Sequence, residues 1–212
     1  MKKISLFFII ISQVASAQTI DNYLSPPFPT DLTASANGKT IAWVFNDKGS
    51  RNIFLAESPA FAAKQITNYS GDDGMEINSI CLNSDGSKIV FVRGNTNNNR
   101  GEPANPAFLQ TSTERVIWVI DNNGKNLYKI AAGSSPAISP DGKTVVYLSC
   151  GQIWTASLTD SLIKPQKLFQ SRGRQSQLRW SPDGAMLAFI SDREDHSFTG
   201  IYNFINQSTL FD

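Results

Sequence analysis

Ser139-Pro140-Asp141-Gly142-Lys143, followed by the apolar stretch Thr144-Val145-Val146-Tyr147-Leu148-Ser149, is typical of a tight turn that leads into a β-strand. Proline presets φ, aspartate bonds its own backbone, and glycine supplies a positive φ. Related turns occur at Ser35–Lys39, Asn83–Ser87 and Ser181–Ala185. The four turn glycines are 48, 56 and 42 residues apart, a spacing typical of four-stranded propeller blades. The repeat therefore predicts a β-propeller.

Each repeat holds further strand-like segments. Apolar centres predict a third strand at Ile53–Leu55, Val116–Val119, Ile153–Trp154 and Ile201–Tyr202. Outer strands are expected at Lys64–Asn68, Asn126–Ile130 and Gln166–Phe169. Beyond residue 17, no segment has a sustained helical period. The pattern predicts an all-β fold, a partial β-propeller of about four blades with four-stranded antiparallel sheets, whose last blade is incomplete because it stops after its third strand.

The expected blades cover about residues 22–69, 75–131, 134–170 and 175–212. Propellers close with roughly four to eight blades, and an incomplete ring leaves faces and edges unpaired. We therefore interpret residues 18–212 as the front half of a larger protein, or as a chain that closes its ring with another copy. Self-association through the open blades is expected.

Residues 1–17 have the pattern of a signal peptide. Lys2 and Lys3 precede the mostly apolar stretch Ile4–Ala15, and small residues at positions 15 and 17 predict cleavage between Ala17 and Gln18. An uncleaved anchor is the alternative, but about a dozen apolar residues fall short of the roughly 20 that span a bilayer. We expect an exported protein, periplasmic or extracellular, without a stable membrane span after cleavage.

Composition excludes several functions. The 212 residues include 19 basic and 18 acidic side chains, for a net charge of +1, so no charge excess favours nucleic acid. Two cysteines cannot form a disulfide scaffold or a four-thiolate metal site. A single histidine argues against most histidine-based metal sites and against a self-contained Ser-His-Asp enzyme. No cofactor and no metal are expected.

Several stretches carry more information than the turns alone. They are Tyr23–Pro29, Ile41–Asn46, Arg51–Ile53, Gly101–Pro106, Ser135–Gly142, Ser191–Phe198 and Gly200–Tyr202. Together these stretches resemble the N-terminal β-propeller of the prolyl oligopeptidase family of serine peptidases, in the branch near dipeptidyl peptidase IV and acylaminoacyl peptidase. The opening motif and the Asp-His-Ser-Phe segment are more specific than the turns, which TolB-type propellers share.

The resemblance implies an exported peptidase whose propeller gates and positions peptide substrates for a C-terminal α/β-hydrolase domain. The 212 residues contain no Gly-x-Ser-x-Gly nucleophile elbow, so no catalytic residue of the family is carried onto this sequence. This chain alone is expected to be inactive. The alternative is a free-standing TolB-type propeller that acts as a periplasmic protein-interaction module.

The stretch Gly94–Thr113 replaces a short connection with a loop of roughly 20 residues, and loops of that length are often functional. We expect it on the edge of the propeller opposite the glycine turns, beside Asp72 and His196. Arg100 and Glu102 are its candidate contacts to substrate or to the hydrolase domain. The alternative is an exposed asparagine-rich insertion without a function of its own.

Other conspicuous residues have structural interpretations. His196 is expected in a hairpin loop, because its sequence neighbours Asp195 and Ser197 cannot form a triad with it. The acidic residues of Gly71–Glu76 suggest a solvated turn, with a cation site as the alternative.

The four tryptophans, Trp43, Trp118, Trp154 and Trp180, are expected to pack between blades rather than to stack on a ligand. Cys81 and Cys150 belong to different blades, which argues against a disulfide.

Overall fold

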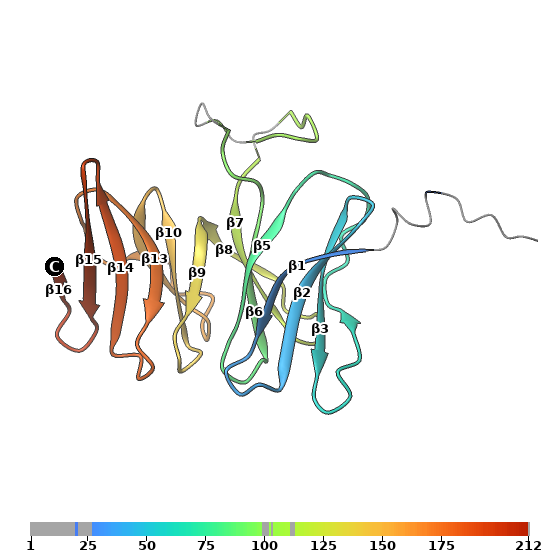
Figure 1. Ribbon diagram of the computed structural model, residues 1–212, viewed down its shortest axis with the longest axis horizontal. Coiled ribbons are helices and arrows are strands. Elements are labelled where there is room, and N and C mark those ends of the chain that lie inside the picture. Colours follow the sequence, from blue (N-terminus) through green and yellow to red (C-terminus); the bar gives the residue numbers. More distant parts are fainter. Residues whose placement is uncertain (1–19, 21–26, 99–101, 103, 111–112, 212) are drawn as a thin grey trace, which may run out of the picture.

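Four antiparallel sheets follow one another along the chain in the computed structural model, which describes residues 20, 27–98, 102, 104–110 and 113–211 (Figure 1). The first sheet contains β1 (Phe28–Ala34), β2 (Thr40–Asp47), β3 (Ser50–Glu57) and β4 (Lys64–Gln65), and the second β5 (Ile77–Leu82), β6 (Lys88–Arg93), β7 (Val116–Asp121) and β8 (Tyr128–Ala132). The third contains β9 (Ser134–Ile138), β10 (Thr144–Ser149), β11 (Gln152–Ser157) and β12 (Gln166–Lys167), and the fourth β13 (Arg174–Trp180), β14 (Met186–Arg193), β15 (His196–Asn203) and β16 (Ser208–Phe211).

Within every sheet the strands pair in sequence order, so each sheet is one meander. We call the sheets blades one to four. This arrangement confirms the all-β partial propeller with four-stranded antiparallel blades. None of the described residues belongs to a helix of the length and apolarity needed to cross a membrane.

The prediction that the last blade stops after its third strand was wrong. β16 pairs with β15 from Asn203↔Ser208 to Gly200↔Phe211. The side-chain oxygen of Asn203 accepts the backbone N–H of Ile205 at 2.8 Å, and Gln207 adopts a φ of 53°, so the chain reverses within a few residues. Phe204 and Ile205 continue the apolar run of β15 in the sequence, which hid this turn.

Apolar side chains fill the space between successive blades. One core joins blades one and two, a second joins blades two and three, and a third joins blades three and four. Val90 and Phe91 are neighbours in β6 and both are fully buried, Phe91 in the first core and Val90 in the second. Successive side chains of a strand point to opposite faces, so an inner strand contributes to two cores and reads as a continuous apolar run.

The repeated turns are held by the same side-chain hydrogen bonds. Ser139 Oγ donates to Asp141 Oδ1 at 2.5 Å, and the backbone N–H of Lys143 donates to the same carboxylate at 3.1 Å. In blade one, Asn37 takes the place of the aspartate and its Oδ1 accepts from Ser35 Oγ at 2.7 Å. The serine hydrogen bond is the main cause that lowers the pKa of Asp141, and the equivalent bond from Ser181 lowers the pKa of Asp183. In blade two, a hydrogen bond from Ser87, on the other side of the turn, is the main cause that lowers the pKa of Asp85.

These turns should contribute to acid sensitivity. A carboxyl group whose pKa is lowered by folding stabilises the protein above its unfolded pKa, and that contribution is lost as the pH falls through the folded pKa. We expect the triple variant Asp85→Asn/Asp141→Asn/Asp183→Asn to lose less stability than the wild type when the pH falls from neutral to below 3.8, the ordinary pKa of an aspartate. Urea unfolding measured across this range tests the difference.

The natural Asn37 turn provides the converse variant. Asn37→Asp should make unfolding more sensitive to acid, because the added carboxylate would accept the same hydrogen bonds. Equal pH dependence in the wild type, the triple variant and Asn37→Asp would contradict the assignment.

Candidate functional site

The connections between the second and third strands of the blades lie along one edge of the propeller, and the four glycine turns lie along the opposite edge (Figure 1). The long connection between β6 and β7 rises from the first of these edges. We call this edge the loop rim. The prediction that Gly94–Thr113 emerges opposite the glycine turns agrees with this placement.

Asn95 attaches the long connection to the segment between β4 and β5. Its side-chain Nδ2 donates to the Gly74 carbonyl at 2.9 Å, and its Oδ1 accepts the Glu76 N–H at 2.8 Å. A Cβ on Gly74 would lie 2.5 Å from Pro106 Cβ, so the two segments touch at a position where only glycine fits. The loop therefore begins on a fixed base beside the acidic segment, as expected.

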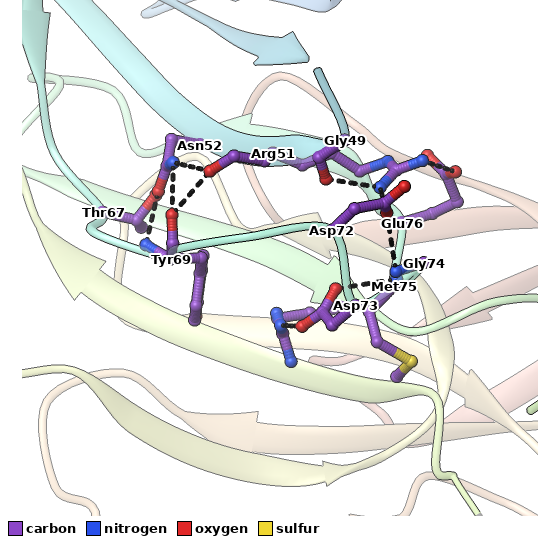
Figure 2. A network of polar contacts seen from close by, with 12 residues as sticks. Gly49, Arg51, Asn52, Thr67, Tyr69, Asp72, Asp73, Gly74, Met75 and Glu76 are labelled. Atoms are coloured by element: carbon purple, nitrogen blue, oxygen red, sulfur yellow. Dashed lines mark hydrogen bonds and ion pairs between the residues drawn. The ribbon is translucent and has the colours of Figure 1, made fainter. Parts of the chain in front are cut away.

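Arg51 of β3 neutralises two of the acidic residues in this segment (Figure 2). Its guanidinium lies 3.2 Å from Asp72 Oδ1 and 3.1 Å from Glu76 Oε1, and it also donates to the Gly49 carbonyl at 2.7 Å. The hydrogen bond from the Gly74 N–H is the main cause that lowers the pKa of Asp72, and the hydrogen bond from Arg51 lowers it further. These carboxylates serve ion pairs, and among the described residues no group of three His, Cys, Asp or Glu side chains is arranged to hold a metal.

Asp73 points the other way and pairs with Arg93 of β6. The Arg93 guanidinium also lies 4.2 Å from the centre of the Tyr69 ring, a cation–π distance. Burial raises the pKa of Tyr69. Arg51 and Arg93 therefore present little free positive charge on the loop rim, because each has an acidic partner.

Asn52 fixes the course of the chain beneath these ion pairs. Its Oδ1 accepts the Tyr69 N–H at 2.7 Å and the Thr67 hydroxyl at 3.0 Å, and its Nδ2 donates to the Tyr69 carbonyl at 2.9 Å. Asn52 is only 7% exposed, so these bonds form away from water. The amide therefore holds the acidic segment against blade one.

Three adjoining cavities run along the loop rim from the long connection to blade four, and we call them together the rim trough. The first has a volume of about 550 Å³ and is bordered by Asn95, Arg115 and Cys150. The second, of about 430 Å³, shares Cys150 with the first and adds Arg174. The third, of about 520 Å³, shares Arg174 and is also bordered by Arg193.

Arg115 is a half-buried cation of the rim trough. Its Nη2 donates to Asn78 Oδ1 at 3.3 Å, while its Nε is buried without a hydrogen-bond partner among the described residues. Burial lowers its pKa, although an arginine stays charged at neutral pH. No described carboxylate lies within 4.0 Å of Arg115, whereas nearby Glu114 pairs with Lys129 at 2.7 Å. The trough thus offers an unneutralised guanidinium to a ligand.

The structure describes some, but not all, of the residues that the sequence analysis singled out as candidates. Arg100 and the cleavage pair Ala17 and Gln18 lie outside the described residues. Glu102 is exposed, and its carboxylate and backbone N–H bond the Asn98 side chain at 2.8 and 3.0 Å. His196 is exposed in the β14–β15 hairpin, where it pairs with Arg193 in the register.

Three of the four tryptophans and both cysteines fit their structural interpretations, but the expectation that Trp43 packs between blades was wrong. Trp118, Trp154 and Trp180 pack against the three cores, but Trp43 lies on the open face of blade one. Cys81 and Cys150 are both free thiols, and burial raises the pKa of Cys81 to about 12.

Sequence reasoning did not find Arg115 or the rim trough. A signal was present, since arginine stands at the rim ends of inner strands at positions 51, 93, 115 and 193. Whether the charge of each arginine is neutralised depends on a carboxylate partner. The carboxylates that pair with Arg51 and Arg93 come from segments about 20 residues away in the sequence, so the pattern did not distinguish these two arginines from Arg115 and Arg193, for which the described residues supply no ion pair.

Comparison with known proteins identifies the fold. No protein-family model and no curated protein sequence matches the chain. Among solved structures, TolB from Acinetobacter baumannii has a TM-score of 0.61 at 15% identity, over 88% of this chain and 43% of that protein. A prolyl endopeptidase has a TM-score of 0.64 at 15% identity, over 87% of this chain and 29% of that one.

The β-propeller domain of the Trilobed protease from Pyrococcus furiosus has a TM-score of 0.60 at 16% identity, over 87% of this chain and 57% of that one. The chain therefore has a partial β-propeller fold like that of TolB and of peptidase propellers. It spans less than two thirds of each of these proteins. At such identities the likeness concerns the fold alone.

The Asn52 network gives a stability test. Asn52→Ala should lower the free energy of unfolding by about 2 to 3 kcal/mol, because buried groups of Thr67 and Tyr69 lose their partners. Asn122→Ala is the matched control, since Asn122 makes one exposed side-chain bond to Glu57, and its effect should stay within about 0.5 kcal/mol. Urea unfolding measures both, and equal effects would contradict the anchoring role.

Proposed function

We propose that this chain is the N-terminal propeller part of an exported serine peptidase of the prolyl oligopeptidase family, near the dipeptidyl peptidase IV and acylaminoacyl peptidase branch. In this role it would gate and position peptide substrates for an α/β-hydrolase domain. The motifs at Tyr23–Pro29 and Ser191–Phe198 support this branch. The chain itself would supply no catalytic residue.

The observation that carries the proposal is the rim trough beside the long β6–β7 connection. A peptide offers carboxylates and backbone carbonyls, and the trough offers the Arg115 guanidinium together with Asn95 and hydroxyl groups such as that of Ser134. The connection starts from a base fixed by Asn95, so its outer part could border the peptide's path. Arg100 and Glu102 would then contact the peptide or the hydrolase domain.

The coding DNA beyond codon 212, translated in the three forward frames, gives a first test. We expect a Gly-x-Ser-x-Gly motif followed later by the aspartate and the histidine of a hydrolase triad. In the resulting longer protein, Thr96–Arg100 is replaced by a Gly-Ser linker of equal length, which leaves the anchor Asn95 in place. We expect a loss of kcat/KM on peptides and no loss on a small p-nitrophenyl ester.

A matched replacement separates function from stability. Asp160–Lys164 is an exposed five-residue segment of the β11–β12 connection, away from the loop rim. The same linker there should leave kcat/KM unchanged. Unchanged peptide turnover in the Thr96–Arg100 variant, with an unchanged melting temperature, would reject the gating role of the connection.

A free-standing propeller that scaffolds periplasmic partners is the second candidate. Its support is the likeness to TolB, which matches this chain about as well as the prolyl endopeptidase does. A stop codon followed by an intergenic gap after codon 212 would favour this interaction module over the peptidase.

Export has its own test. The proposed signal peptide predicts that secreted protein begins at Gln18, so mass spectrometry of the mature N-terminus should find loss of residues 1–17. Ala17→Phe should block this cleavage, because the −1 position accepts only small side chains. A protein that keeps Met1 and stays in the cytoplasm would contradict export.

A further inference from the structure

The outward face of blade one is apolar and hollowed. Trp43, Phe45 and Phe54 form an aromatic cluster with ring centres 4.9 to 6.2 Å apart. A groove of about 530 Å³ lies beside them and is also bordered by Leu32, whose side chain is 74% exposed. None of the other described blades packs against this face, since the first core contains only residues of the opposite face.

Trp43 occupies a position that is buried in every other blade. In the strand register, Trp43 faces Phe54 just as Phe91 faces Trp118 and Tyr147 faces Trp154. The equivalent second-strand residues Phe91, Tyr147 and Phe189 are at most 1% exposed, and each packs against the preceding blade. The face of blade one is therefore built to receive a preceding blade.

The outward face of blade four is the complementary half of the same interface. Ala188 pairs with Ile201 as Ala42 pairs with Leu55 and as Val90 pairs with Val119. In blades one and two, both residues of this pair are buried against the following blade, whereas Ile201 in blade four is 37% exposed. Blade four thus presents the surface that a following blade normally covers.

The first strand of each blade adds charged residues to the two open faces. Each contains a bulge with a residue of positive φ, which is Asp31 in blade one and Ser135 in blade three. Cys81 of blade two lies 3.8 Å from the carbonyl of Pro136 in the following blade. Arg179 holds the Cys81 position in blade four, because it pairs with Ala188 as Cys81 pairs with Val90. Leu32 is the blade-one equivalent of Pro136, so a blade one placed after blade four would bring Arg179 close to the Leu32 carbonyl, beside Asp31.

We propose that two copies of this chain join head to tail, with the blade-four face of each packed on the blade-one face of the other. Two such contacts close a ring of eight blades, which is within the range of known propellers. The contacts are heterologous, so the rotation per blade decides between a closed ring and an open chain. The second copy is the occupant because this chain carries both halves of the interface, with Arg179 on one face and Asp31 beside the position that Arg179 would contact on the other.

The test uses one charged substitution on each face. Trp43→Glu damages the blade-one face, and Ile201→Glu damages the blade-four face. Light scattering after size exclusion should give the wild type twice the 23.3 kDa of one chain, and each variant alone should weaken the association at least about tenfold. An equimolar mixture of both variants should restore a dimer, because one contact between two intact faces can form.

The mixture also controls for folding, since misfolded variants could not restore the dimer. Leu162→Glu is the matched surface control, because Leu162 is 87% exposed in the β11–β12 connection, and this variant should dimerise like the wild type. All proteins carry the same N-terminal segment, so its apolar residues do not distinguish them.

Each alternative has its own result. A monomeric wild type, or variants that stay apart when mixed, would overturn the proposal. An Ile201→Glu variant that still dimerises would indicate pairing of two blade-one faces and would also overturn it. Wild-type species that grow with concentration beyond a dimer would overturn the closed ring. These outcomes concern the 212-residue chain by itself. They leave the proposed peptidase role untouched, because in a longer protein further blades would cover the same two faces.

Discussion

Burial of apolar side chains between successive blades is the interaction on which the rest of the structure depends. An isolated four-stranded sheet has two apolar faces and cannot cover either of them. Val90 and Phe91 in β6 illustrate the solution, because these adjacent residues are buried in two different cores. Every inner blade is therefore stabilised from both sides, and residues 27–98 and 113–211 hold the order of the blades without a helix or a disulfide.

This packing leaves the loop rim available for recognition. The strands fix where each connection begins, and the ion pairs of Arg51 and Arg93 then set the charge of the rim. Arg115 differs because the carboxylate next to it in sequence, Glu114, pairs with Lys129 instead. The rim trough therefore has a local positive centre although the whole chain is close to neutral. Such a centre suits a ligand that carries a carboxylate, as a peptide does.

The two end faces follow from the same packing rule. Blade one presents a receiving face with Trp43, and blade four presents the opposite face with Ile201. In a longer peptidase, further blades would cover both faces. When the 212-residue chain is by itself, a second copy can cover both faces. The two proposals concern different surfaces, so the proposed peptide path along the rim and the proposed closure of the ring can be examined separately.

The sequence by itself determined the blade repeat, because turns such as Ser139–Lys143 and the apolar strand after each depend on local backbone chemistry. It also indicated that the long connection lies opposite these turns, since strand order fixes that side. It did not indicate β16, whose turn is set by an asparagine side chain within an apolar run. Only the tertiary structure decided which arginines are neutralised, which tryptophan is left on an open face, and that Asn52 holds the acidic segment. Each of these depends on contacts between residues distant in the chain, and local sequence carries no record of such partners.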